Sequence, residues 1–216
     1  MAVDELQYTL LSDGPTDKAL MPILTWLLHE HLPHCAVQPN WADLRRVPRL
    51  PRTLHERVQA ATNLYPCNLL FVHRDAEGAS PPDRKAEVHD AVSLARDTGV
   101  IPPAIAVVPV RMTEAWLLFD VPAIRAAAGN PNGSVNLDLP RSADLESIPN
   151  PKTVLRGLIL EATELGTHRR GRFDVSNAIQ RIPRYIDDFS PLRVLSAFAA
   201  LEERIVEVLK EQHRCD

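Results

Sequence analysis

Short apolar runs alternate with helical patterns over the first half of this 216-residue chain. Two of the runs, "CNLLFV" and "AIAVVPV", are continuously apolar, which is typical of parallel strands that helices cover on both faces. The apolar runs predict strands at Leu6–Leu11, Cys35–Gln38, Cys67–Val72 and Ala104–Val110. The patterns between them predict helices at Asp17–His31, Thr53–Asn63 and Pro82–Thr98. This alternation predicts an α/β fold, a mostly parallel central sheet flanked by helices.

After Val110 the pattern changes from strands to helices and loops. "MTEAWLLFDVPAIRAAAG" predicts a helix that is broken at Pro122 and ends at Gly129. Further helices are expected at Lys152–Leu165, Val175–Ile182 and Pro191–Lys210. We therefore expect three parts, which are an α/β core at 1–130, a polar loop or lobe insertion at 131–150, and a helical C-terminal part at 151–216 packed on the core.

Composition narrows the class of protein. Hydrophobic residues are 45% and charged residues 24%, as in folded soluble domains. No apolar stretch is long enough for a membrane span, and "MAVDELQ" lacks the basic region of a signal peptide, so the expected location is the cytoplasm with no membrane partner. Three widely spaced cysteines predict neither a disulfide framework nor a metal knuckle.

Basic residues cluster in two segments of a chain whose net charge is −4. The segments are "RRVPRLPR" and "HRRGR", and either could contact nucleic-acid phosphates or be a solvated loop. The candidate nucleic-acid-binding residues are Arg45, Arg46, Arg49, Arg52, Arg169, Arg170 and Arg172.

Acidic residues follow three of the predicted strands. Asp13 and Asp17 follow the first strand, Asp75 and Glu77 the third, and Glu114 the fourth. Because the carboxyl ends of parallel strands meet at one edge of a sheet, we expect these acids to share a pocket. Mg²⁺ is bound in proteins by a few carboxylates together with waters and substrate phosphates. The sequence therefore predicts a divalent-cation site.

Each acidic cluster also has an ordinary structural interpretation. Thr16 could be a helix N-cap with Asp17 at the positive end of the helix, and Asp75 could belong to a solvated loop. "HRD" at 73–75 lacks the other motifs of a kinase catalytic loop. The prediction of a site depends on all three clusters meeting.

Two of the acidic stretches resemble the signatures of Toprim-type metal nucleases, the fold shared by topoisomerases, bacterial primases and OLD-family nucleases. "TLLSDGPTDKAL" is similar to a strand that ends in Glu-Gly, with Asp13 in place of the glutamate. "LLFVHRDAEGAS" is similar to a strand that ends in Asp-x-Asp, with Glu77 in place of the second aspartate.

Two further stretches resemble a defence-associated Toprim-like group of bacterial proteins. They are "VVPVRMTEAWLLFD", a strand followed by Glu-Ala-Trp-Leu-Leu-x-Asp, and "NPKTVL", which has a Pro-Lys pair. This resemblance implies a Toprim-like fold and an effector nuclease of an anti-phage system. The chain has no Walker A motif, so the ATPase that often accompanies such nucleases would be a separate partner.

The resemblance also implies roles for individual residues in hydrolysing DNA or RNA with Mg²⁺ or Mn²⁺. Asp75 and Glu77 would hold the metal, with Glu114 as a further ligand. Asp13 would complete the metal site or move protons, and Lys152 would neutralise charge on the scissile phosphate. Aspartate in place of glutamate changes the reach by about 1 Å. A catalytically inactive adaptor subunit and a small-molecule phosphoesterase therefore stay open as alternatives.

Overall fold

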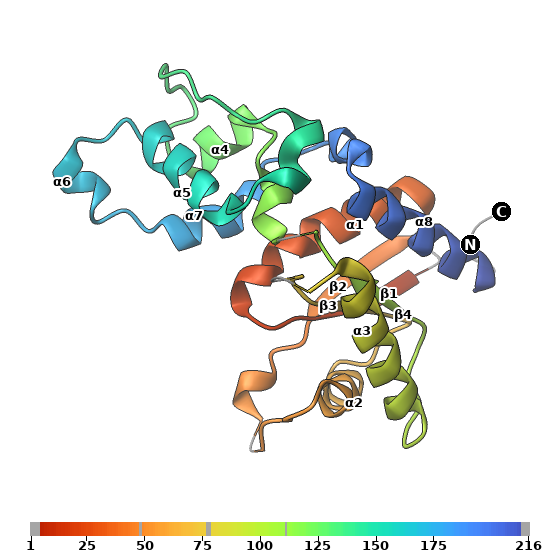
Figure 1. The fold of residues 1–216 in the computed structure, drawn as a ribbon. Coiled ribbons are helices and arrows are strands. Elements are labelled where there is room, and N and C mark those ends of the chain that lie inside the picture. Colours follow the sequence, from red (N-terminus) through yellow and green to blue (C-terminus); the bar gives the residue numbers. More distant parts are fainter. Residues whose placement is uncertain (1–4, 48, 77–78, 111, 213–216) are drawn as a thin grey trace.

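A parallel sheet of four strands lies at the centre of the computed structural model, which describes residues 5–47, 49–76, 79–110 and 112–212 (Figure 1). The order is β2-β1-β3-β4, and every pair of neighbours is parallel. The strands are β1 (Glu5–Leu11), β2 (Ala36–Trp41), β3 (Leu69–His73) and β4 (Ala104–Val107). The predicted α/β fold class is confirmed.

Helices cover both faces of this sheet. The α-helices are α1 (Leu20–His31), α2 (Leu54–Leu64), α3 (Pro81–Arg96), α4 (Val121–Ala127), α5 (Pro151–Ala162), α6 (Thr167–Arg170), α7 (Val175–Arg181) and α8 (Ser196–Glu211). The 3₁₀ turns are η1 (Pro15–Ala19), η2 (Leu44–Arg46), η3 (Thr113–Leu117), η4 (Ser142–Ser147), η5 (Ile182–Arg184) and η6 (Ser190–Val194). Helices α2 and α3 pack on one face, and α1 and α8 pack on the other.

The strand alternation divides the buried side chains into two clusters. Leu6, Tyr8 and Leu10 of β1 face α1 and α8, whereas Leu11 faces α2 and α3, as the period of two requires. None of the helices in the described ranges is long and apolar enough to cross a bilayer.

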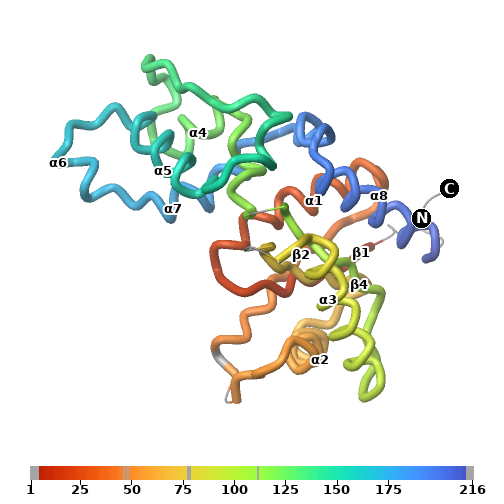
Figure 2. Tube along the Cα trace, viewed as in Figure 1, coloured from red at the N-terminus to blue at the C-terminus, as the bar shows by residue number. Residues whose placement is uncertain are grey.

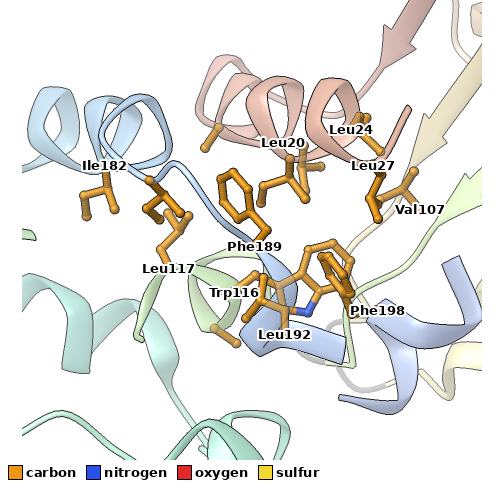
Figure 3. Close-up of a cluster of buried hydrophobic side chains, with 14 of the residues drawn as sticks. Leu20, Leu24, Leu27, Val107, Trp116, Leu117, Ile182, Phe189, Leu192 and Phe198 are labelled. Atoms are coloured by element: carbon orange, nitrogen blue, oxygen red, sulfur yellow. The ribbon is translucent and has the colours of Figure 1, made fainter. Parts of the chain in front are cut away.

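The larger cluster continues beyond the sheet into a second group of helices, α4, α5 and α7 (Figures 1 and 2). Trp116 packs edge-on against Phe198 of α8 with ring centroids 5.4 Å apart. Phe189 lies beside Leu20 of α1 in the same cluster, as Figure 3 shows. Burial of these rings places η3, and with it Glu114, against the carboxyl end of the sheet.

Two predicted helices are each divided into two elements. The helix expected to break at Pro122 consists of the turn η3 and the helix α4, so the break lies just before Pro122. Helix α4 begins at Val121, with Pro122 in its first turn, and its N-cap residue Asp120 accepts a hydrogen bond from Ala123 N at 2.8 Å. The helix expected at Pro191–Lys210 is divided at Leu195, whose ψ is 132°. The predicted end at Gly129 is confirmed by its φ of 77°.

The segment 131–150 is attached to the end of α5. Glu164 Oε1 accepts a hydrogen bond from Val135 N at 2.9 Å, and Asn130 Nδ2 donates to Ala162 O at 3.0 Å. The segment contains the turn η4, which the sequence analysis did not predict. These contacts hold the start of the segment beside α5, the helix that carries Lys152.

Candidate functional site

The predicted acids line one pocket at the carboxyl end of the sheet. Its volume is about 300 Å³, and it receives Asp13 and Asp17 after β1, Asp75 after β3, Glu114 after β4 and Lys152 from the start of α5. Residue Glu77, the other predicted metal ligand, lies outside the described residues. The structure therefore brings together every described residue of the predicted catalytic and metal set.

Asp17 is held at the wall of this pocket by the turn that follows β1. Its Oδ2 accepts a hydrogen bond from Gly14 N at 2.9 Å, and its Oδ1 accepts one from Thr16 Oγ1 at 3.3 Å. Gly14, and not Thr16 as predicted, occupies the N-cap position of η1. The Asp17 carboxylate is thus buried and oriented before any ligand binds.

His73 lies directly behind Asp75 and is only 2% exposed. Its Nδ1 is 3.0 Å from Val107 O, and because a carbonyl only accepts hydrogen bonds, Nδ1 carries a proton. Its Nε2 is 3.3 Å from Asp75 Oδ1 and 3.5 Å from Thr113 Oγ1. Burial acts to lower the pKa of His73, but the contact with Asp75 and the charges of Asp75 and Asp17 raise it above its usual value.

The contact between His73 and Asp75 is an ion pair without good hydrogen-bond geometry. Asp75 Oδ1 is buried and has no hydrogen-bond partner among the described residues. Sequence reasoning missed His73, although residues two apart in an extended chain point to the same side. The histidine therefore positions Asp75 and leaves the carboxylate able to bind a further group.

The environment of Glu114 disfavours the charged form of its carboxyl group. Burial is the main cause that raises its pKa above the usual value, and the charges of Asp75 and Asp17 act in the same direction. Its own backbone N–H and the charge of Lys152 oppose the shift without cancelling it. Lys152 makes no ion pair with the residues that the structure describes. Negative charge in the pocket is only partly balanced, which favours a bound cation.

Asp13 lines the same pocket, but two arginines bind its carboxylate. Arg57 Nη1 donates to Oδ1 at 2.6 Å, and Arg74 Nη1 lies 2.9 Å from both oxygens. Arg57 Nη2 also donates to Ser12 O at 2.6 Å. Burial acts to raise the pKa of Asp13, but these arginines outweigh it and lower the pKa. Two adjacent guanidinium groups oppose a divalent cation at Asp13 and make the carboxylate a weak base.

Other basic side chains lie near the same edge of the sheet. Lys18 Nζ is 4.1 Å from the ring centroid of Trp41, and the guanidinium of Arg45 is 5.2 Å from it. Trp41 Nε1 donates to Ser12 Oγ at 3.0 Å, which ties this aromatic ring to the residue before Asp13. Sequence reasoning missed Arg57, Arg74 and Trp41 because their positions depend on the fold.

The six predicted nucleic-acid-binding arginines whose side chains the structure describes do not line the pocket of acids. Arg45 binds Asp43 through two contacts of 2.7 Å, and Arg49 and Arg52 line a small groove before α2. The side chain of Arg46 lies outside the described residues. The other three, Arg169, Arg170 and Arg172, are exposed in and after α6, at the outer end of the helical group (Figure 1).

A divalent cation fits this pocket only with few protein ligands. Within the described ranges, no three carboxylate, histidine or cysteine side chains converge as a ready ligand set. Mg²⁺ commonly takes one or two carboxylates and keeps several waters, and Asp75 Oδ1, which contacts His73 but accepts no hydrogen bond from the described residues, meets that requirement. Comparison of the chain with protein-family models, with curated proteins and with solved structures finds no match.

Proposed function

We propose that this pocket binds Mg²⁺ or Mn²⁺ and hydrolyses phosphodiester bonds in DNA or RNA. The observation that carries the proposal is that Asp17, Asp75 and Glu114, from three separate connections of a parallel sheet, line one pocket together with Lys152. Carboxylates at the carboxyl ends of parallel strands supply the hard oxygen ligands that these cations prefer.

Asp75 is the first ligand in this proposal, because its buried Oδ1 has no other partner among the described residues. Glu114 is the second ligand, since a cation would stabilise the charge that burial and neighbouring acids disfavour. Glu77 stays a predicted ligand. When bound, the cation polarises a phosphoryl oxygen and makes a water molecule more acidic. Lys152 would bind a non-bridging phosphate oxygen and neutralise its charge.

Asp13 has a different role in the proposal from the one that the Toprim resemblance implies. Its ion pairs fix the guanidinium groups of Arg57 and Arg74 beside the pocket. Fixed guanidinium groups are well suited to a phosphate group, because their donors match its oxygens. We therefore assign Asp13 as a positioning residue for two anion-binding arginines.

The cellular context in this proposal comes from the resemblance to the defence-associated group. An effector nuclease of an anti-phage system in the cytoplasm, with a separate ATPase partner, is consistent with a chain that has no Walker A motif. The exposed arginines of α6 and those before α2 would contact the nucleic-acid backbone on either side of the pocket.

Cleavage assays test this proposal directly. Supercoiled plasmid, single-stranded DNA and tRNA are incubated with the protein and Mn²⁺ or Mg²⁺, with chelator as the negative control. We expect Asp75→Asn and Lys152→Ala each to reduce the rate by about 100-fold or more. Asp144→Asn, which alters an exposed ion pair outside the pocket, is the matched control and should cleave like the wild type.

A catalytically inactive adaptor is the second candidate function. It is favoured by the ion pairs of Asp13 and by the lack of a ready three-ligand set among the described residues. Binding of Mn²⁺ without hydrolysis of any of the three polymers or of nucleotide monoesters would support the adaptor. Hydrolysis of monoesters alone would identify a small-molecule phosphoesterase.

A further inference from the structure

The two edge strands of the sheet, β2 and β4, differ in the backbone hydrogen-bond donors on their outer edges. At the end of β2, Ala42 N donates to Leu10 O at 2.9 Å. The backbone groups of every second residue, counted back from Ala42, therefore point toward β1. Pro39 lies between two of these residues, so its backbone points outward. Proline has no N–H, and it therefore removes the donor with which another strand could pair. The edge of β2 is protected against strand addition.

The edge of β4 keeps its donors. Leu70 N donates to Pro103 O at 2.9 Å and Arg74 N donates to Val107 O at 3.2 Å. This parallel register turns the backbone of Ile105 toward β3, and it turns the N–H and C=O groups of Ala104 and Ala106 outward. No hydrogen bond links these outward groups to any residue of the described ranges.

A groove of about 750 Å³ lies along this edge, between α3 and α8. Ala104 and Ala106 form part of its floor, and Val88 and Val92 of α3 and Leu201 of α8 supply apolar wall surface. The four residues of β4 extend over about 13 Å, at roughly 3.3 Å per residue. The groove thus has the floor and walls of a site for one added strand.

The two walls of the groove carry opposite charge. On α3, Lys85 and Arg96 are exposed and make no ion pair with the residues that the structure describes, and Asp90 only partly offsets them. The α8 wall carries three exposed glutamates and one arginine, which itself binds two of the glutamates: Glu203, Glu207, Glu211 and Arg204.

Side chains of a strand point alternately to the two faces of a sheet. In a strand added to β4, alternate side chains would therefore face the basic wall on α3 and the acidic wall on α8. We propose that this groove binds an extended peptide segment of a partner protein, with alternating acidic and basic side chains, as a fifth strand on β4. This site is separate from the pocket of acids and does not depend on the proposed nuclease function.

The test uses two fluorescein-labelled peptides of about eight residues, one with alternating Lys and Glu and one with the same residues in two blocks. Fluorescence anisotropy with the full chain should give an affinity about tenfold higher for the alternating peptide. Ala106→Pro removes one outward N–H and should weaken binding by about tenfold. Glu203→Lys combined with Glu207→Lys, both at exposed positions, should weaken it as well.

A version of the alternating peptide with N-methylated backbone amides supplies the same test without altering the protein, should Ala106→Pro fail to fold. Equal binding of the alternating and block peptides, or full binding of the N-methylated peptide, would overturn the proposal. Sedimentation equilibrium tests whether a second copy of this chain, and not a peptide of another protein, occupies the edge. A wild-type dimer that Ala106→Pro converts to a monomer would assign the edge to a second copy of the chain and overturn the peptide assignment.

Discussion

Asp13→Asn tests whether Asp13 positions arginines or holds a metal. The substitution keeps the shape of the side chain, removes its charge and places an amide where Arg74 now meets two oxygens. The Asp13 side chain is 44% exposed and each arginine is 22% exposed, so solvent screens both ion pairs in part. Summing two such pairs, we expect the free energy of unfolding to fall by about 1–2 kcal/mol at pH 7.

The loss should depend on pH in a direction that the pKa of Asp13 determines. Its arginine contacts lower that pKa below the ordinary value of 3.8, although burial opposes them. A carboxyl group with a lowered pKa in the folded state contributes stability above its ordinary pKa, and this stability is lost as pH falls through the folded value. The difference between wild type and Asp13→Asn should therefore be complete at pH 7, begin to shrink below about pH 4, and close only below the pKa that Asp13 has in the folded state.

Urea unfolding at pH 7 and at a series of pH values below about 4 measures the stability difference. Calorimetric titration with Mn²⁺ at pH 7 measures metal binding by the same proteins. Asp144→Asn is the matched control, because Asp144 is also 44% exposed but, among the residues that the structure describes, pairs only with Arg141, which is 85% exposed. We expect the control to change stability by less than about 0.5 kcal/mol. If Asp13→Asn abolishes Mn²⁺ binding and leaves stability unchanged, Asp13 is a metal ligand and the positioning role is refuted.

Three further substitutions test other parts of the structure. Because the pKa of Glu114 is raised, its contribution to stability is lost as pH rises through that pKa, so metal-free Glu114→Gln should melt higher than wild type at pH 7 and equally below about pH 4. Trp116→Ala should cost about 3–5 kcal/mol in urea unfolding, and Trp116→Phe clearly less, because the ring is fully buried. In Gly133→Ala the new Cβ would lie 2.6 Å from Arg125 Nη1 and 2.7 Å from Glu164 Oε1. These side chains would have to move, which would weaken the hydrogen bond of Glu164 that holds the segment 131–150. Limited proteolysis within 131–150 should therefore be faster than in wild type.

The elements that local pattern determines were predictable. The first four residues of strand β3 are all apolar, as expected for a strand that is covered on both faces. Gly129 follows the end of α4, where its φ of 77° suits glycine. The division before α8 was not predictable in this way. Glu146, fifty residues earlier, accepts hydrogen bonds from Ser196 N at 3.1 Å and Ala197 N at 2.8 Å. A cap supplied from so far along the chain leaves no local signal.

In the candidate site, too, some features could be predicted from the local sequence pattern and others depend on residues far along the chain. That Asp75 and Glu114 would share a pocket followed from the parallel sheet, since both lie in connections that follow strands ending at one edge. The environment of Asp13 did not follow, because its partners are Arg57 and Arg74, at separations of 44 and 61 residues. Topology brings residues to one edge of a sheet, whereas the direction of each side chain depends on charges that other elements bring there.

The charges at this edge are divided between two neighbouring places. Asp17, Asp75 and Glu114 lie in the pocket with Lys152, and burial together with the charges of the other two acids raises the pKa of Glu114. Asp13 lies at the border, where Arg57 and Arg74 already balance its charge. A cation would be most stable among the carboxylates, and a phosphate beside the arginines, because each then meets opposite charge. In the proposed function, a substrate that carries phosphate and recruits a cation would place opposite charge at both positions at once.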